Sequence, residues 1–321
     1  AIIMTNTDKL LLVYGDVTLG VHGSDFHYIF SYQTGGPESI VMDGKEWLYR
    51  TPRPTFWRAT TDNDRGNKFS QKSAMWLAAD MFLPCTGYRV ITDGTENTEL
   101  TAPANNKYKS EQYAEQVTIV FTYTTVTVPS TTVTVSYTVQ TDGKMIVEAA
   151  YSGKEGLPQL PVFGMRFIMP TKADGYRYEG LSGETYPDRM DGGVEGIYEV
   201  KGLPVTPYLV PQECGMHMQT KWAEIYRTSV LANETREKKQ TGFRISSDGQ
   251  PFAFSCLPYT AEELENATHQ EELPPARRTV LCVLGAVRGV GGIDSWGAEV
   301  EEAYHIHADR DIMYRFCIEK A

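Results

Sequence analysis

Apolar and polar residues alternate with a period of two over much of the chain. The clearest stretches are 117–123 and 133–139, where β-branched and aromatic residues occupy every second position. Such alternation is typical of strands that bury one face. We predict a strand in each stretch, another over 126–128, and one over 145–149 after an Asp-Gly hairpin signal. The same pattern predicts shorter strands at 10–14, 27–32, 39–42, 162–168, 251–256, 280–286 and 312–318.

Helical signals are few. Residues 73–82 could form two or three turns, and 261–267 follow a capping box with Thr260 as N-cap and Glu263 at the third helical position. Strands do not alternate with long helices, so a parallel α/β barrel is disfavoured. We therefore predict an all-β fold, a large antiparallel β-sandwich with a few short helices, formed as a single domain by residues 1–321.

Composition narrows the functional classes. The 321 residues are 41% hydrophobic and 22% charged, which excludes a disordered chain. The net charge of −11, without a concentrated basic patch, argues against nucleic acid and against anionic membranes as partners. No apolar run is long enough for a transmembrane helix. Five scattered cysteines and a start without signal-peptide features predict reduced thiols and a cytoplasmic location.

Two motifs suggest metal sites only superficially. The run 62–66, Asp-Asn-Asp-Arg-Gly, begins like a calcium loop, but the later ligands are misplaced, and we predict a tight polar loop. His305 and His307 would share one face of a strand, but zinc needs a third ligand and the sequence offers no obvious one nearby. We therefore predict a solvent-facing histidine pair and no metal site in this chain. Three glutamates at 262, 263 and 265 suit the first turns of a helix, which indicates a structural role.

Trp296 lies among small, turn-forming residues, from Gly291 to Gly297. An indole that projects from such a loop could stack against the C–H face of a sugar. An indole that folds back to fill a gap in the core would fit the same pattern.

Several separate segments resemble glycoside hydrolase family 2 β-galactosidases when they are taken together. The segment 58–66 is similar to that family's R-A-x-x-D-N-D-x-G, and 184–189 to its E-x-Y-P-D-R. Residues 206–215 resemble T-P-Y…P-x-E-N-G, 258–269 resemble R-Y-S…T-S-H, and 291–296 resemble G-G-D-D-S-W. Their order and spacing agree from about residue 10 to residue 318.

The resemblance is to the last, fifth domain of those long enzymes, a β-supersandwich related to galactose mutarotase. It implies the small subunit of a heterodimeric β-galactosidase, which hydrolyses β-galactosides such as lactose and carries out transgalactosylation. The two catalytic glutamates of this retaining family lie on a (β/α)₈ barrel, as do its Mg²⁺ and Na⁺ sites. The resemblance therefore implies that the catalytic residues and the ions belong to a large subunit, and that this chain alone is inactive.

The same resemblance assigns roles to residues of this chain. Trp296 matches a tryptophan that forms a platform for the sugar. Gly66 matches a glycine of a mobile entrance loop, here with Asp62, Asn63 and Asp64, and we expect this glycine to be needed for a positive φ. Residues Tyr186, Asp188 and Arg189 match a motif that we expect to be structural, with Arg189 bound to a carboxylate or to carbonyl groups.

Three positions depart from the family pattern, and two other functions stay open. Cys214 replaces an asparagine, Ile293 an aspartate, and Arg65 an apolar residue of the entrance loop. One alternative is an independent aldose 1-epimerase, which needs an acid and a base such as His217 with Glu213, or His269 with Glu265. The other is a stand-alone sugar-binding module that uses Trp296 without chemistry.

Overall fold

The alternating segments form antiparallel sheets. The computed structural model describes residues 8–77, 79–100, 111–231, 238–294 and 296–321. Within these ranges all strand pairs are antiparallel and belong to three sheets, so the predicted all-β class is confirmed.

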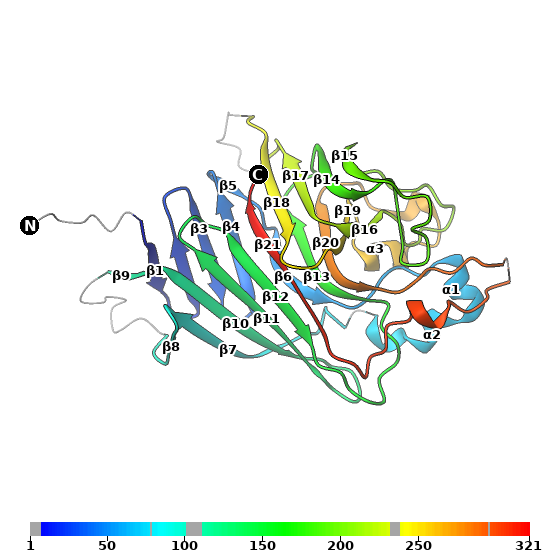
Figure 1. Ribbon diagram of the computed structural model, residues 1–321, viewed down its shortest axis with the longest axis horizontal. Helices are drawn as coiled ribbons and strands as arrows, with labels where there is room; N and C mark the ends of the chain where they lie inside the picture. Colours follow the sequence, from blue (N-terminus) through cyan, green and yellow to red (C-terminus); the bar gives the residue numbers. More distant parts are fainter. Residues whose placement is uncertain (1–7, 78, 101–110, 232–237, 295) are drawn as a thin grey trace, which may run out of the picture.

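The largest sheet has ten strands and runs the length of the molecule (Figure 1). Its order is β15-β14-β17-β18-β21-β12-β11-β10-β7-β8. Along β10 and β11, apolar residues are buried and every second residue is partly exposed, as the period of two predicts. The strands are β7 Cys85–Thr92, β8 Thr95–Asn97, β10 Gln116–Thr124, β11 Thr132–Gln140, β12 Met145–Tyr151, β14 Gly175–Leu181, β15 Glu195–Lys201, β17 Trp222–Arg227, β18 Thr241–Ser247 and β21 Ile312–Lys320.

Two smaller sheets pack against this long one. The six-stranded sheet, order β5-β4-β3-β2-β1-β9, contains β1 Leu10–Tyr14, β2 Thr18–His22, β3 Phe26–Ser31, β4 Gly36–Met42, β5 Lys45–Glu46 and β9 Gln112–Ala114. The five-stranded sheet, order β16-β19-β20-β13-β6, contains β6 Arg50–Thr55, β13 Val162–Met169, β16 Met216–Thr220, β19 Phe252–Leu257 and β20 Thr279–Val287.

Aromatic rings join the layers. Phe30 of the six-stranded sheet contacts Tyr137 of the long sheet, with ring centroids 5.7 Å apart. At the other end, Phe167 of the five-stranded sheet contacts Phe316 of the long sheet at 6.2 Å. All four side chains are buried, and one core cluster includes residues from all three sheets. The sandwich is thus held by burial of the inner faces.

Some local predictions are wrong. Residues 126–128 form a bend, because Thr125 and Thr131 close a turn around Pro129, whose ring nitrogen cannot donate to a strand ladder. The helical segment at 73–82 is reduced to a 3₁₀ turn, η1 (Ala74–Trp76), preceded by α2 (Phe69–Lys72). The sequence pattern does not predict strand β6, because it carries two prolines. Prolines are tolerated here because β6 lies at the edge of its sheet.

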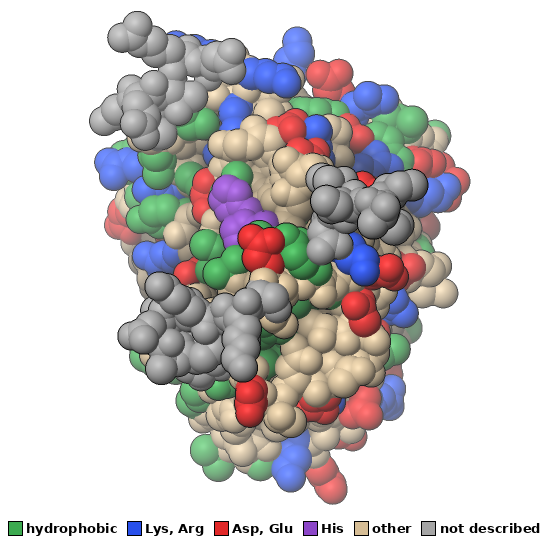
Figure 2. All heavy atoms as spheres, turned by 90° about the vertical axis from the view of Figure 1, so that its left-hand side faces the viewer, with side chains coloured by type: hydrophobic (Ala, Val, Ile, Leu, Met, Phe, Trp, Pro, Cys, Tyr) green, Lys and Arg blue, Asp and Glu red, His purple; other side chains and the backbone are tan. Residues whose placement is uncertain are grey.

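The remaining helices are short. The predicted capping box is confirmed in α3 (Ala261–Asn266), where Thr260 accepts from the amide of Glu263. Further single turns are η3 (Gln270–Glu272) and η4 (Glu302–Tyr304). In the described ranges we find no helix long and apolar enough to cross a membrane. At the end of the molecule that carries the six-stranded sheet, acidic and basic side chains are intermingled (Figure 2).

Candidate functional site

The loop that carries Trp296 connects β20 to β21 and projects at one end of the sandwich, beside α1 (Figure 1). The sequence left open whether Trp296 projects from the loop or fills a gap in the core. Its side chain is 88% exposed, so it does not fill the core. One carboxylate oxygen of Asp294 accepts the amides of Trp296 at 2.9 Å and Ala298 at 3.1 Å. The apex is therefore closed by its own hydrogen bonds and directs a large apolar surface to solvent.

The base of this loop is bound by the segment that follows β14. The two carboxylate oxygens of Asp188 accept the amides of Val290 at 2.9 Å and Gly291 at 2.7 Å. Arg189 donates from its guanidinium to the carbonyl oxygen of Gly291. Two adjacent side chains thus bind two amide groups and one carbonyl group of consecutive loop peptides. Because these partners are fixed side chains and not water molecules, they position the loop backbone.

The predicted polar loop at 62–66 is instead a helix, α1 (Asp62–Asn67). Thr61 and Asp64 form a reciprocal capping box, and Arg65 pairs with Asp62 across one turn at 2.6 Å. These interactions satisfy helix N-terminal amides and favour helical backbone over the turn that the Asp-Asn-Asp run suggested. Arg65, the departure from the family pattern, therefore stabilises the helix surface.

A buried ion pair joins α1 to the Trp296 loop. Arg58 donates to both oxygens of Asp64, at 2.6 and 3.3 Å, and to the carbonyl oxygen of Gly289 at 3.0 Å. Asn63 adds a hydrogen bond to the carbonyl oxygen of Val290 at 3.1 Å. Arg58 and Asp64 are both almost fully inaccessible to solvent. Loss of either partner would leave a buried charge without its counter-ion.

Gly66 matters for a different reason from the one predicted. Its φ is not positive; instead, its backbone packs directly on that of Gly297. A Cβ built on Gly66 would lie 2.6 Å from the Cα of Gly297, closer than carbon atoms can approach. Gly297 itself has a φ of +82°. Two glycines therefore allow the helix and the Trp296 loop to touch backbone to backbone.

Glu213 lies near Arg58 and lines the same pocket. Its carboxyl accepts from the hydroxyl of Tyr186 at 3.1 Å, and both residues are buried. Burial raises the pKa of Glu213 to about 7, although the positive charge of Arg58 acts in the opposite direction. The adjacent Cys214 is also buried, and burial raises the pKa of its thiol to about 12, so the thiol stays protonated and inert.

The acid–base pairs considered for an epimerase are engaged elsewhere. His217 is buried between the Tyr176 hydroxyl, at 2.9 Å, and the Gly183 carbonyl oxygen, at 3.0 Å, and burial lowers its pKa to about 4. Glu265 accepts from Thr60 in place of His269. His269 pairs with Glu272 at the surface. Each group thus has a structural partner in place of a shared sugar site.

The histidine pair differs from its prediction as well. His305 and His307 follow η4 and are not on a strand, and Glu302 lies between their rings. The three ligand atoms fall within 4.8 Å of one another. The sequence did carry the signal, since Glu302 precedes His305 by three residues, which is one helical turn.

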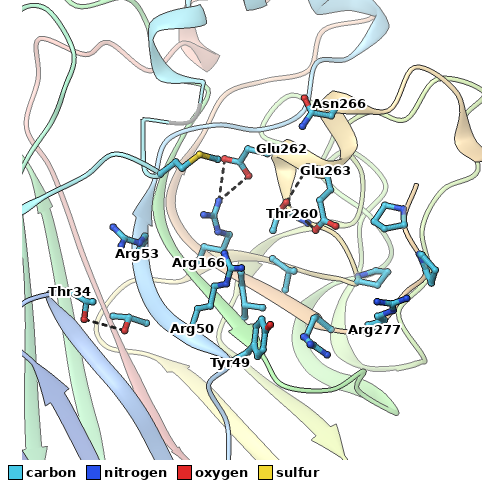
Figure 3. A pocket seen from close by; sticks show the side chains of 18 residues that line it. Thr34, Tyr49, Arg50, Arg53, Arg166, Thr260, Glu262, Glu263, Asn266 and Arg277 are labelled. Carbon is cyan, nitrogen blue, oxygen red and sulfur yellow. Dashed lines mark hydrogen bonds and ion pairs between the residues drawn. The ribbon is translucent and has the colours of Figure 1, made fainter. Parts of the chain in front are cut away.

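A second region is a cavity of about 810 Å³ beside β6, β13 and α3 (Figure 3). Several arginines line it, among them Arg50, Arg53, Arg166 and Arg277. The most buried of these, Arg166, pairs with Asp80 at 2.5 Å and with Glu262 at 3.1 Å. Glu262 is therefore a structural counter-ion, as its helix position suggested. Asp80, which sequence patterns did not reveal, has its pKa raised to about 6 by burial.

Comparison with known proteins identifies the family. The family model for the beta galactosidase small chain matches residues 22–318. The chain belongs to the beta galactosidase small chain family. It is 62% identical to the β-galactosidase small subunit of Latilactobacillus sakei, over 98% of this chain and 99% of that protein. It is 34% identical to a β-galactosidase of Halalkalibacterium halodurans, over 97% of this chain but 28% of that protein.

The relatives that are named β-galactosidase in full are much longer than this chain. The chain spans little more than a quarter of the Halalkalibacterium protein and of a 33% identical β-galactosidase from Lactobacillus delbrueckii subsp. bulgaricus. Among solved structures, a putative aldose 1-epimerase from Escherichia coli aligns over 97% of this chain and 98% of its own, with a TM-score of 0.45 and 10% identity.

We expect Gly66→Ala to loosen the Trp296 loop, because the added methyl group must displace Gly297. If the loop loses 1–2 kcal/mol of local stability, chymotrypsin should cut after Trp296 roughly 5- to 30-fold faster. The rate can be measured by mass spectrometry of timed digests. Gly87→Ala is the matched control, since a Cβ at Gly87 would make only an ordinary 3.7 Å contact with Thr122. Equal cleavage rates in both variants would contradict the close-approach argument.

We expect Glu213→Gln to flatten the pH dependence of stability. The pKa of Glu213 is raised on folding, so the folded state holds this proton more tightly than the unfolded state. Its contribution is therefore fully present below about pH 4.5 and is lost as the pH rises through about 7. Urea unfolding from pH 5 to 7.5 should show a smaller decline for the variant, by on the order of 3 kcal/mol. Parallel declines would show that Glu213 ionises as readily when folded as when unfolded.

Proposed function

We propose that this chain is the small subunit of a heterodimeric β-galactosidase, and that it completes the sugar site of a large catalytic subunit with Trp296. The observation that carries the proposal is an exposed indole on a loop whose base is fixed by three other segments. A large apolar ring usually costs free energy when it faces water, so a loop with a hydrogen-bonded base that presents one suits a contact outside the chain. A sugar's C–H face is the ligand that we assign to it.

The division of labour follows from this assignment. A retaining glycosidase needs two carboxyl groups about 5 Å apart on either side of the glycosidic bond. We propose that these glutamates, together with Mg²⁺ and Na⁺, belong to the large subunit, as does most of the binding surface for lactose. The small subunit would shape the acceptor side, where water or a second sugar enters. Hydrolysis and transgalactosylation would then both depend on Trp296.

An apolar surface near the loop supports a protein partner. Exposed hydrophobic side chains gather in two segments, which meet where the amide of Val128 contacts the sulfur of Met75 at 3.4 Å. Lys72, just before this surface, pairs with Glu299 of the Trp296 loop at 3.7 Å. The surface therefore lies close to the proposed sugar site. Its exposed members are Met75, Leu77, Val126 and Val128, and two further exposed side chains, Phe82 and the cavity-lining Met81, follow in the first segment.

The thiols fit a reducing compartment. The five cysteines are free, and Cys214, Cys256 and Cys317 are buried. These three buried thiols act as small apolar side chains. This supports a cytoplasmic location, where thiols stay reduced.

We expect no hydrolysis of o-nitrophenyl β-galactoside by this chain alone, and activity after it is mixed with its large subunit. The measurement is a colour assay on each purified chain and on the mixture, with gel filtration to follow assembly. Activity of the isolated chain would contradict the proposal. Galactose binding without any effect of the large subunit would favour a stand-alone sugar-binding module.

We expect Trp296→Ala to weaken the assembled enzyme while leaving assembly intact. Loss of one aromatic face should cost roughly 1–3 kcal/mol in transition-state binding, seen as a lower kcat/KM for lactose. Trp296→Phe should recover part of it, because the flat apolar face remains. Met313→Ala, which removes another exposed hydrophobic side chain, is the control and should be neutral. Unchanged kinetics in Trp296→Ala would exclude the indole from the site.

A further inference from the structure

The segment that follows the Trp296 loop contains a second group of chemically active side chains. Glu302, at the start of η4, is mostly exposed, His305 is 8% exposed and His307 is 27% exposed. One oxygen of Glu302 lies 3.0 Å from Nδ1 of His305, and the other lies 2.8 Å from Nε2 of His307. The carboxylate therefore bridges two imidazoles that converge from the same side.

Neighbouring groups fix the tautomer of His305. Its Nε2 lies 2.7 Å from the carbonyl oxygen of Val300, which can only accept, so this nitrogen carries a hydrogen. Its Nδ1 lies 3.2 Å from Nε2 of Gln159, whose own oxygen is occupied by Arg288. The Gln159 amide thus presents a donor to Nδ1. With Nε2 donating to Val300, Nδ1 faces both the Gln159 amide, at 3.2 Å, and the Glu302 carboxylate, at 3.0 Å.

A lone pair and a carboxylate oxygen at 3.0 Å repel each other unless a proton or a metal ion lies between them. A metal ion meets this need, because imidazole nitrogen and carboxylate oxygen both donate lone pairs to it. Ligand atoms about 2.1 Å from a tetrahedral ion lie about 3.4 Å apart. The pairs at 3.0 and 2.8 Å would therefore open by about half an ångström around an ion, and the three ligand atoms already fall within 4.8 Å of one another. The hydrogen bond from His305 Nε2 to a backbone carbonyl is also the usual support for a metal-bound histidine.

We propose that Glu302, His305 and His307 form a binding site for a divalent transition-metal ion, with Zn²⁺ as the preferred ion. Two imidazoles and one carboxylate are a common zinc ligand set that leaves a fourth position for water. The two nitrogens disfavour Mg²⁺, which selects oxygen ligands. Glu299, 3.9 Å from His305, is not a ligand, because it faces the Nε2 side and pairs with Arg288 at 2.6 Å.

The site would stabilise the base of the Trp296 loop. Val300, which accepts from His305, ends that loop, and the carbonyl oxygen of Tyr304 in η4 accepts the amide of Gly289 at 3.0 Å, where the loop begins. An ion bound by Glu302, His305 and His307 would stabilise the η4 turn. Both ends of the Trp296 loop are hydrogen-bonded to this turn. This inference is independent of the proposed galactosidase role, since it depends only on side chains of this chain.

The test is Zn²⁺ titration of the full, untagged chain after removal of metals with a chelator, followed by isothermal calorimetry at pH 7.5. We expect one ion per chain and a higher Tm with Zn²⁺ but not with Mg²⁺. His307→Ala and Glu302→Gln should each weaken binding at least tenfold. Neither residue holds the loop backbone in the contacts described above, so both variants should fold, which their Tm without metal will check.

The matched control is His269→Ala. His269 has the same spacing from a glutamate, with Nδ1 3.4 Å from Glu272, but in this surface pair no second imidazole takes part. The His269→Ala variant should bind Zn²⁺ as tightly as the wild type. The chain also has free thiols that could bind a metal ion. Such binding would give the Co²⁺ complex a thiolate charge-transfer band, and we expect no such band. Absence of Zn²⁺ binding, equal binding in every variant, or a thiolate band would each overturn the proposal.

Discussion

Arg58 is the residue on which the site depends. Its guanidinium is buried, and it contacts Asp64 in α1 and the carbonyl oxygen of Gly289, which lies 231 residues further along the chain. A buried cation of this kind needs acceptors, and both terminal nitrogens of Arg58 have them, whereas its Nε has no hydrogen-bond partner among the described residues. The path of the chain around Arg58 is therefore constrained: α1 must present its N-terminal carboxylate, and the β20–β21 connection must turn a carbonyl group inward.

The other contacts of the loop extend this constraint. Asp188 and Arg189 bind the next peptides of the loop, and Gly66 lets the helix approach Gly297 without a side chain between them. All these contacts are made to backbone atoms of the loop. The indole of Trp296 is left out of them, so the backbone of the loop is held while this side chain stays exposed.

Ionisable groups cluster in three places of the fold, and their charges are balanced in different ways. Near Arg58, which contacts the Trp296 loop, Glu213 accepts from Tyr186 and has a raised pKa. In the arginine-lined cavity, Asp80 and Glu262 together neutralise Arg166. Near η4, Glu302 faces two imidazoles, where the proposed metal ion would supply the positive charge. Each arrangement follows from the cost of leaving a charged or polar group without a partner.

Local patterns in the sequence determined the sheet class, the long strands and the capping box of α3, because alternation and capping involve residues only a few positions apart. The family motifs also located Trp296, Asp188 and Arg189. Tertiary structure alone decided that residues 62–67 are helical, that Gly66 serves close approach, and that Glu302 lies between His305 and His307. The Arg58 contact to Gly289 joins distant segments, and spacing along a chain does not encode such contacts. Such contacts depend on how the three sheets pack. That packing is determined by the burial of many side chains at once.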